Sequence, residues 1–192
     1  MAELNETYWT NRYLNAETAW DVGSVSTPLK EYFEQLTNKN IRILIPGCGN
    51  GYEAEHLWNL GFTEIYVADL SAIPLDQLKS RNPEIDSQYF LKTDFFELQE
   101  TFDLIIEQTF FCAISPNLRR AYAQKSASLL ADGGKLVGVL FDREFSGGPP
   151  FGGEKEEYKS YFAEYFKEIY VESCYNSIKP RQDSELFMIC KK

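Results

Sequence analysis

Short apolar runs alternate along the chain with longer segments of mixed polarity. The apolar runs are rich in β-branched, aliphatic and aromatic residues and predict buried strands at 41–45, 64–69, 88–91, 102–107 and 135–141. The intervening segments predict helices at 52–60, 72–81 and 116–130, and a further helix near 154–163 precedes strands near 167–173 and 184–190. This alternation indicates an α/β fold with a mainly parallel sheet that helices cover on both faces.

Residues that start and stop helices fall at the predicted limits. Gly61 follows the first helix, and Ser71 precedes the second as a candidate N-cap. Ser115 and Pro116 favour the start of the next helix, since a hydroxyl caps and proline suits the first helical position. The two glycines at 133–134 predict that this helix stops before Asp132.

Several polar or glycine-containing segments come directly after predicted strands. They are the loop at Gly47, Asp69, Asp94 and the segment 107–112. Right-handed crossovers bring the carboxyl ends of parallel strands to one edge of the sheet, where ligands bind in such folds. We therefore expect these four segments to converge on a single cleft.

The glycine-rich loop has the spacing G-x-G-x-G, with Gly47, Gly49 and Gly51 after Pro46. Such a loop turns tightly from strand to helix and lets a ligand approach the backbone. A dinucleotide fingerprint needs a glycine where Tyr52 stands. A nicotinamide-dependent oxidoreductase is therefore the less favoured alternative.

Two acidic residues at predicted strand ends favour an adenosylmethionine site. Asp69 lies 18 residues after Gly51 and is placed to accept hydrogen bonds from the two ribose hydroxyls. Asp94 is placed to accept from the adenine amino group, with Phe95 packing near the base. The alternative is that the glycine loop is only a turn and that the two acids are helix caps.

The composition narrows the classes of partner. The net charge is −10, from 19 basic and 29 acidic residues. Without a basic stripe the chain is a poor candidate for nucleic acid, whose phosphates must be neutralised. It lacks the polybasic signature of a membrane-surface protein, and no apolar run approaches the ~20 residues that span a bilayer. The polar, acidic first residues do not resemble a signal peptide.

The few cysteines and the single histidine restrict the chemistry further. Four widely spaced cysteines (Cys48, Cys112, Cys174, Cys190) form no C-x-x-C pair, so we expect reduced thiols and a cytoplasmic protein. His56 is the only histidine, and we expect no metal site. We expect Cys112 to be a packing residue. For Arg143 and Arg181, steering of an anion is the sharper interpretation and a surface ion pair the simpler one.

Six stretches in order, 9-WTNRYLNAETAWDVGSVSTPL-29, 45-IPGCGNGYE-53, 67-VADLS-71, 93-TDFFE-97, 102-FDLIIEQTFFCAISPNLRRAYA-123 and 147-GGPPF-151, resemble the thiopurine S-methyltransferase superfamily. Within it they are most similar to the branch of thiol, thiocyanate and halide ion methyltransferases. The resemblance implies S-adenosylmethionine as methyl donor and a Rossmann-like class I methyltransferase fold, a seven-stranded sheet with an antiparallel last strand. It implies one domain over 1–192, with a lid and first helix at 1–38 and a core at 39–192.

The resemblance also implies roles for particular residues. The cofactor-binding residues it implies are Trp9, Tyr13, Trp20, Gly47, Gly49, Asp69, Asp94, Phe95 and Gln108. The acceptor pocket it implies is formed by Trp9, Tyr13, Gln108 and Phe151. Tyr13 stands where the ion-methylating branch usually has tryptophan, and Gln108 where it often has tyrosine, so both departures border the reacting end.

The implied reaction needs no general base. A thiolate, hydrosulfide, thiocyanate or halide is already a competent nucleophile for displacement at a sulfonium methyl group, so no catalytic acid–base residue is expected. We expect a small-molecule thiol or anion, or a thiopurine, as acceptor, and a monomer. A non-catalytic adenosylmethionine-binding module is the alternative. The loop 146–153 has the glycine content either of a mobile flap or of a connector.

Overall fold

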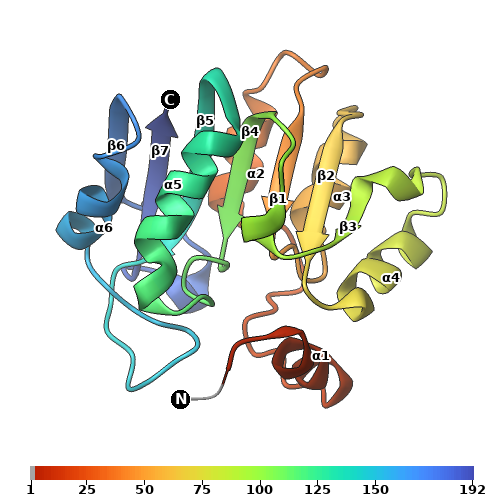
Figure 1. The fold of residues 1–192 in the computed structure, drawn as a ribbon, viewed down its shortest axis with the longest axis horizontal. Coiled ribbons are helices and arrows are strands. Elements are labelled where there is room, and N and C mark those ends of the chain that lie inside the picture. The colour runs from red at the N-terminus through yellow and green to blue at the C-terminus, as the bar shows by residue number, and fades with distance from the viewer. Residues whose placement is uncertain (1–2) are drawn as a thin grey trace.

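The computed structural model describes residues 3–192 and is built on one seven-stranded sheet (Figure 1). The strands are β1 (Ile43–Pro46), β2 (Ile65–Asp69), β3 (Phe90–Lys92), β4 (Phe102–Gln108), β5 (Leu130–Phe141), β6 (Glu168–Ser173) and β7 (Glu185–Lys191). Their order in the sheet is β3-β2-β1-β4-β5-β7-β6. The parallel pairs join β1 to β2 and β4, β2 to β3, and β4 to β5, whereas β7 runs antiparallel to both of its neighbours. The predicted sheet with an antiparallel last strand is confirmed.

Helices cover both faces of the sheet because neighbouring strand residues point to opposite sides. In β4, Leu104 and Ile106 pack into one core and Ile105 into the other. The first core also contains apolar residues of α2 (Thr27–Glu34), α3 (Tyr52–Asn59) and α4 (Ala72–Arg81). The second contains those of α5 (Arg119–Leu129) and α6 (Lys155–Phe162). The near-continuous apolar runs of the sequence are thus buried from both sides.

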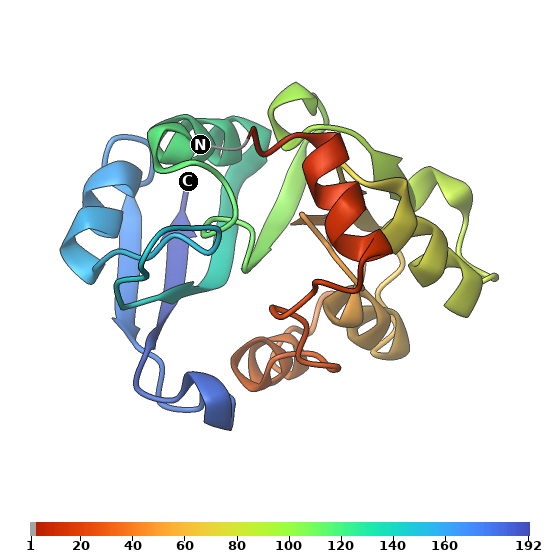
Figure 2. The same ribbon diagram turned by 90° about the horizontal axis from the view of Figure 1, so that it is seen from below.

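Helix α1 (Glu6–Leu14) lies apart from these two layers. Figures 1 and 2 show it across the edge of the sheet at which β1, β2 and β4 end. None of its residues is buried. The predicted N-terminal lid, 1–38, therefore corresponds to α1, a connecting segment and α2, with its first two residues outside the described part of the chain.

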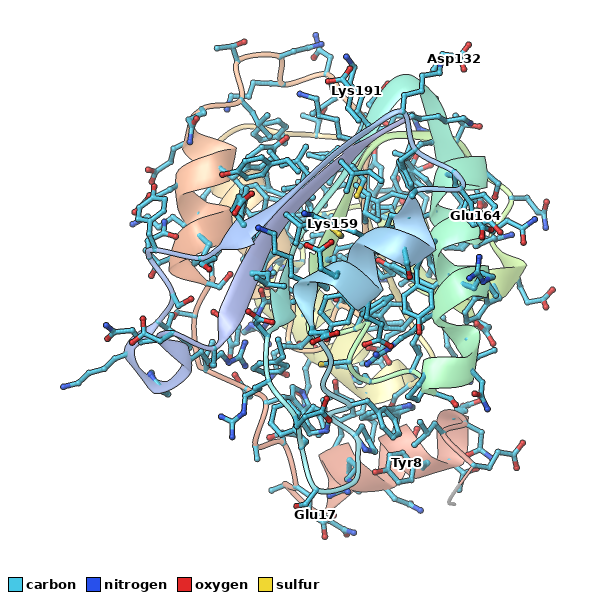
Figure 3. The ribbon with its side chains drawn as sticks, turned by 90° about the vertical axis from the view of Figure 1, so that its left-hand side faces the viewer. Tyr8, Glu17, Asp132, Lys159, Glu164 and Lys191 are labelled. Carbon is cyan, nitrogen blue, oxygen red and sulfur yellow. The ribbon has the colours of Figure 1, made fainter. Side chains whose placement is uncertain are left out.

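Element limits agree with the sequence prediction except around two segments. The helix expected from 116 begins with a 3-10 turn, η3 (Pro116–Leu118), before α5 starts at Arg119. The strand expected at 135–141 begins five residues earlier, because Leu130 already pairs with Phe102 before the register shifts. Asp132 therefore lies within β5, at the end of the molecule opposite the lid residues Tyr8 and Glu17 (Figure 3).

Neither a membrane-spanning helix nor a metal-binding cluster occurs among residues 3–192. No described helix combines the length and apolar character needed to cross a membrane. No group of three or more histidine, cysteine, aspartate or glutamate side chains there is arranged to hold a metal ion.

Candidate active site

The glycine loop after β1 adopts a conformation that favours glycine at each of its three glycines. Gly47, Gly49 and Gly51 have φ of 56°, 51° and 73°, in the left-handed region. A Cβ atom at Gly47 would lie 2.3 Å from the Phe110 ring, and one at Gly51 would lie 2.4 Å from Leu78. At Gly49 the nearest atom to such a Cβ is the Tyr13 hydroxyl oxygen, 3.4 Å away. The loop is therefore packed from the core side and faces the N-terminal segment on its other side.

Asp69 ends β2 beside this loop, as the sequence predicted. Its carboxylate accepts hydrogen bonds from the backbone N–H groups of Gly49 (3.2 Å) and Ser71 (2.9 Å) and is only 9% exposed. Burial raises the pKa of Asp69 to about 6, although these N–H donors oppose the rise. A carboxylate with a raised pKa at a strand end is the kind of group that binding sites contain.

Asp94 and Phe95 lie at the next strand end. The Asp94 carboxylate accepts from the Phe96 N–H (2.9 Å) and caps the 3-10 helix η2 (Phe95–Glu97), as the helix-cap alternative anticipates. The Phe95 ring packs against Phe110 and Tyr122, and the residue is 3% exposed. The exposed carboxylate of Asp94 is thus accessible, whereas Phe95 offers almost no surface.

Three aromatic residues of the N-terminal segment pack against one another, and one of them, Tyr13, lies beside the glycine loop. Trp20 meets Trp9 edge-to-face at a centroid distance of 5.7 Å and Tyr13 at 5.8 Å. Burial, together with the nearby Asp69 and Cys48, raises the pKa of the Tyr13 hydroxyl. The structure therefore brings together the three lid residues predicted from the sequence, and Tyr13 lies beside Gly49 and Asp69.

Polar contacts attach the lid segment, residues 3–22, to the core. Thr10 donates to the Ser71 hydroxyl (2.9 Å), and Glu6 pairs with Lys92 (2.7 Å). Asp21 accepts from Asn50 on the glycine loop (2.5 Å). Each contact joins the lid segment to a residue at the carboxyl edge of the sheet, so residues 3–22 lie across that edge.

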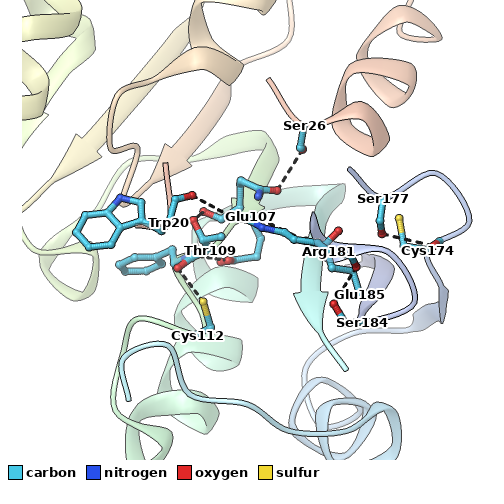
Figure 4. A network of polar contacts seen from close by, with 12 residues as sticks. Trp20, Ser26, Glu107, Thr109, Cys112, Cys174, Ser177, Arg181, Ser184 and Glu185 are labelled. Carbon is cyan, nitrogen blue, oxygen red and sulfur yellow. Dashed lines mark hydrogen bonds and ion pairs between the residues drawn. The ribbon is translucent and has the colours of Figure 1, made fainter. Parts of the chain in front are cut away.

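Gln108 and Arg181 contact the segment that connects α1 to α2, and Figure 4 shows Arg181 beside the Trp20 backbone. Ser26, just after the lid segment, donates its hydroxyl to Gln108 Oε1 (3.2 Å). Arg181 is 8% exposed, pairs with Glu185 (3.4 Å) and donates to the Trp20 carbonyl (2.9 Å). The expected surface position of the Arg181 ion pair is therefore wrong. The pair exists, but the guanidinium is buried and holds the Trp20 backbone.

The loop 146–153 is fixed at its carboxyl end. The Phe151 N–H donates to the Cys112 carbonyl (2.7 Å), and Arg119 donates to the carbonyls of Phe151 (3.1 Å) and Gly152 (2.8 Å). Gly153 pairs with Arg143, which is itself exposed. Phe151 is thus held beside the 108–112 loop, and Cys112 is a buried packing residue as expected.

Sequence reasoning overlooked two buried charged residues behind the site, Glu107 and Arg119. Glu107 is fully buried at the end of β4, and Arg119 is 1% exposed at the start of α5. The Arg119 guanidinium lies over the rings of Phe111 (4.9 Å) and Tyr158 (5.5 Å). A sequence signal existed for Glu107 alone, because Gly138 interrupts the neighbouring apolar strand directly opposite it.

Comparison with known proteins decides the family. Residues 4–188 match the family model described as thiopurine S-methyltransferase. The chain belongs to the thiopurine S-methyltransferase family. It is 33% identical over 165 residues to a protein named probable thiol methyltransferase 2 from Arabidopsis thaliana, covering 83% of this chain and 73% of that protein. It is 29% identical to thiocyanate methyltransferase 1 from Brassica oleracea, covering 95% of this chain and 83% of that protein.

The fold agrees with this assignment. The structure of 1,6-didemethyltoxoflavin-N1-methyltransferase from Burkholderia thailandensis, with S-adenosylhomocysteine bound, superimposes with a TM-score of 0.75 at 15% identity. The superposition covers 97% of this chain and 86% of that one, and shows that the two share the class I methyltransferase fold.

As a member of the thiopurine S-methyltransferase family, the chain is an S-adenosylmethionine-dependent methyltransferase. The residues present fit that donor. The glycine loop is packed less closely at Gly49 than at Gly47 and Gly51, and the buried Asp69 carboxylate supplies an acceptor for hydroxyl groups beside it. Trp9 and Trp20 supply aromatic rings, which attract a sulfonium cation, from the segment that lies across the same edge of the sheet.

Proposed function

We propose that the chain transfers a methyl group from S-adenosylmethionine to a small sulfur nucleophile or inorganic anion: a thiol, hydrosulfide, thiocyanate or halide, with thiopurines as a further candidate class. The observation that carries this proposal is the buried guanidinium of Arg181 next to the Trp20 backbone. The thiol and thiocyanate methyltransferases named above support the same acceptor class.

Arg181 suits an anionic acceptor because of where its charge lies. The whole chain carries a net charge of −10, which repels anions at long range. Near Cys112, burial and the Glu107 carboxylate raise the thiol pKa, and the positive charges of Arg181 and Arg119 oppose that rise. Arg181 is thus a cationic group close to the 108–112 loop, and we propose that it attracts an anionic acceptor there.

The donor supplies an electrophilic methyl group on a positively charged sulfur. For this donor we propose contacts with Trp9, Tyr13, Trp20, Gly47, Gly49, Asp69, Asp94, Phe95 and Gln108. The protein's own part is to align the acceptor and to remove its hydration. In-line alignment is worth up to about 7–11 kcal/mol in well-oriented systems. The aromatic residues Trp9, Tyr13 and Trp20 close the edge of the sheet and exclude water from an anion there.

No proton transfer is required of the side chains. His56, the only histidine, lies on α3 against Phe33, with ring centroids 6.3 Å apart. The proposed acceptors are already nucleophilic as anions, so alignment and desolvation suffice. The four cysteines are free and buried, which supports the proposed reducing, cytoplasmic location. We further propose that residues 1–192 act as one domain and as a monomer.

An acceptor panel tests the proposal. Purified protein is incubated with S-adenosylmethionine and, separately, with a small thiol, hydrosulfide, thiocyanate, iodide and a thiopurine. Release of S-adenosylhomocysteine and of the methylated product is measured in each case. We expect turnover with at least one of the first four. Tight S-adenosylhomocysteine binding without turnover on any acceptor would instead support a non-catalytic binding module.

A matched pair of variants tests the role of Arg181. The double variant Arg181→Gln/Glu185→Gln removes the buried charge without leaving Glu185 unpaired. We expect at least a tenfold loss of kcat/KM for thiocyanate. Arg143→Gln removes an exposed arginine and should change that value less than twofold. Equal effects in both variants would reject a local role for Arg181.

A further inference from the structure

Glu107 is a buried acid whose carboxylate accepts hydrogen bonds from the 108–112 loop and from α5. Oε1 accepts from the N–H groups of Phe110 (2.8 Å) and Phe111 (2.9 Å), and Oε2 accepts from the Tyr122 hydroxyl (2.8 Å). Among the described residues no cationic side chain pairs with it. Burial consequently raises the pKa of Glu107 to about 7, with the three donors opposing the rise.

The neighbouring strand is built to leave room for this side chain. Gly138 on β5 is the register partner of Glu107 on β4. A Cβ atom at Gly138 would lie 2.3 Å from the Glu107 Cβ and 2.5 Å from its carbonyl oxygen. The space opposite Glu107 therefore exists only because residue 138 is glycine, at a place in the strand where a larger side chain would otherwise strengthen the core.

The carboxylate holds the 108–112 loop in a demanding conformation. Thr109 has φ of 61°, in the left-handed region that β-branched residues avoid. Beyond it the chain curls back, so that two successive N–H groups reach Glu107 and the Ala113 N–H donates to the Phe110 carbonyl (2.9 Å). Without an acceptor at Oε1, both N–H groups would lose their partner inside the protein.

This loop carries two residues that face the site. Gln108 directly follows Glu107 and bonds to Ser26, and the Phe110 ring packs on the backbone of Gly47. The loop also holds Phe151 through the Cys112 carbonyl. A shift of the 108–112 loop would therefore move Gln108 and Phe151, which we place at the acceptor, together with Phe110, which packs on the glycine loop.

We propose that Glu107 is a positioning residue for methyl transfer: its carboxylate fixes the 108–112 loop and so sets the places of Gln108, Phe110 and Phe151 around the acceptor. The inference rests on the proposed function only in placing the acceptor beside this loop. Glu107 touches neither reactant in this arrangement and acts through the backbone of the residues that follow it.

The test compares Glu107→Ala with the conservative Glu107→Gln, whose side-chain oxygen still accepts from both N–H groups. Iodide is the acceptor, because it carries no proton whose titration complicates the rates. At saturating S-adenosylmethionine, Glu107→Ala should lose about 100-fold in kcat/KM for iodide, and Glu107→Gln less than fivefold. The Kd of S-adenosylhomocysteine should change by less than tenfold in both.

Val171→Ala, a buried truncation in β6 at the far edge of the sheet, controls for lost stability. If it lowers kcat/KM as far as Glu107→Ala does at an equal loss of Tm, the positioning role is rejected. An equally large loss in Glu107→Gln also rejects it.

Amide hydrogen exchange of the peptide 108–114 provides a measurement that needs no turnover. We expect at least tenfold faster exchange in Glu107→Ala, and unchanged exchange in Glu107→Gln and Val171→Ala. Unchanged exchange in Glu107→Ala would overturn the proposal even if the acceptor class is right. If exchange is faster in Glu107→Ala but the wild type methylates no acceptor, Glu107 does fix the 108–112 loop and the proposed function is rejected instead.

Discussion

The lid segment and the 108–112 loop lie on opposite sides of the same site but are held in opposite ways. Helix α1 has no buried residue, and its ion pair, Glu6 with Lys92, joins side chains that are 54% and 50% exposed. The 108–112 loop is fixed from behind by Glu107 and Arg119, which are 0% and 1% exposed. Regions with few buried contacts open at low free energy, whereas buried polar anchors open only with the core. We therefore expect the lid segment to open at lower free energy than the 108–112 loop, the floor of the proposed site.

The largest expected effect comes from removing the buried anchor Arg119. Arg119→Ala leaves the carbonyls of Phe151 and Gly152 without their donor and should lower the free energy of unfolding by about 3–5 kcal/mol. Arg120→Ala is the matched control, because Arg120 pairs with Glu164 on the surface, where a pair contributes about 0–1 kcal/mol. Denaturant unfolding of both variants measures the difference. Equal losses of unfolding free energy would show that the buried Arg119 stabilises the protein no more than the exposed Arg120 does.

A second effect concerns Asp69, which lies between lid and floor. Because its folded-state pKa is raised from 3.8 to about 6, its contribution to stability is present below pH 4 and is lost as pH rises through 6. Relative to Asp69→Asn, the ligand-free wild type should lose up to about 3 kcal/mol of unfolding free energy between pH 4 and pH 7. Parallel stability curves for the two proteins across this range would contradict the raised pKa.

The same residue should control binding of the cofactor product. Asp69→Ala should weaken S-adenosylhomocysteine binding by about 10- to 100-fold, since hydrogen bonds to a charged group contribute about 1.5–3 kcal/mol. Isothermal titration calorimetry measures the change, with Asp76→Ala, an exposed acid on α4, as control. Affinity within twofold of wild type would remove Asp69 from the ribose contact.

Loosening the lid should have a smaller, local effect. Thr10→Val removes the donor to the Ser71 hydroxyl, at a cost of about 1 kcal/mol. We expect about fivefold faster amide exchange in α1 and no change in β4. Thr7→Val, on the exposed side of the same helix, should leave exchange unaltered. A matching change in β4 would show that the lid unfolds with the core.

The smallest effect is expected for Lys92→Ala at the exposed pair with Glu6. The loss of unfolding free energy should be no more than about 0.5 kcal/mol, so the Tm should shift only slightly. Any shift should vanish at high salt. Thermal unfolding at low and high ionic strength measures it. A large, salt-independent loss would mean that the lid is anchored as firmly as the floor.

The sequence predicted the parts of the fold that depend on local pattern. The apolar runs between helix caps and glycines predicted the strands of the sheet. Ser71 caps α4 as expected and accepts a hydrogen bond from the Ile73 N–H. The early start of β5 was missed because residues 131–134 resemble a turn, whereas they form the register shift between the pairs Phe102–Leu130 and Leu104–Lys135. Local composition does not report a long-range pairing of this kind.

The charged anchors were missed for a related reason. Arg119 and Arg120 are neighbours of identical type, and only the way α5 packs decides that the first is buried and the second exposed. Glu107 resembles an ordinary acid at a strand end until Gly138 is known to lie opposite. The position of Asp69 followed from spacing alone, because strand ends converge in every parallel sheet.

The burial of Cys112 affects whether the protein can methylate its own thiol. Desolvation raises the pKa of the Cys112 thiol to about 12, and its Sγ donates to the Thr109 carbonyl (3.1 Å). Only the thiolate is a strong nucleophile, so at neutral pH this sulfur stays unreactive beside a methyl donor. An enzyme proposed to alkylate small sulfur compounds thus keeps the thiol of its 108–112 loop in the protonation state that protects it from methylation.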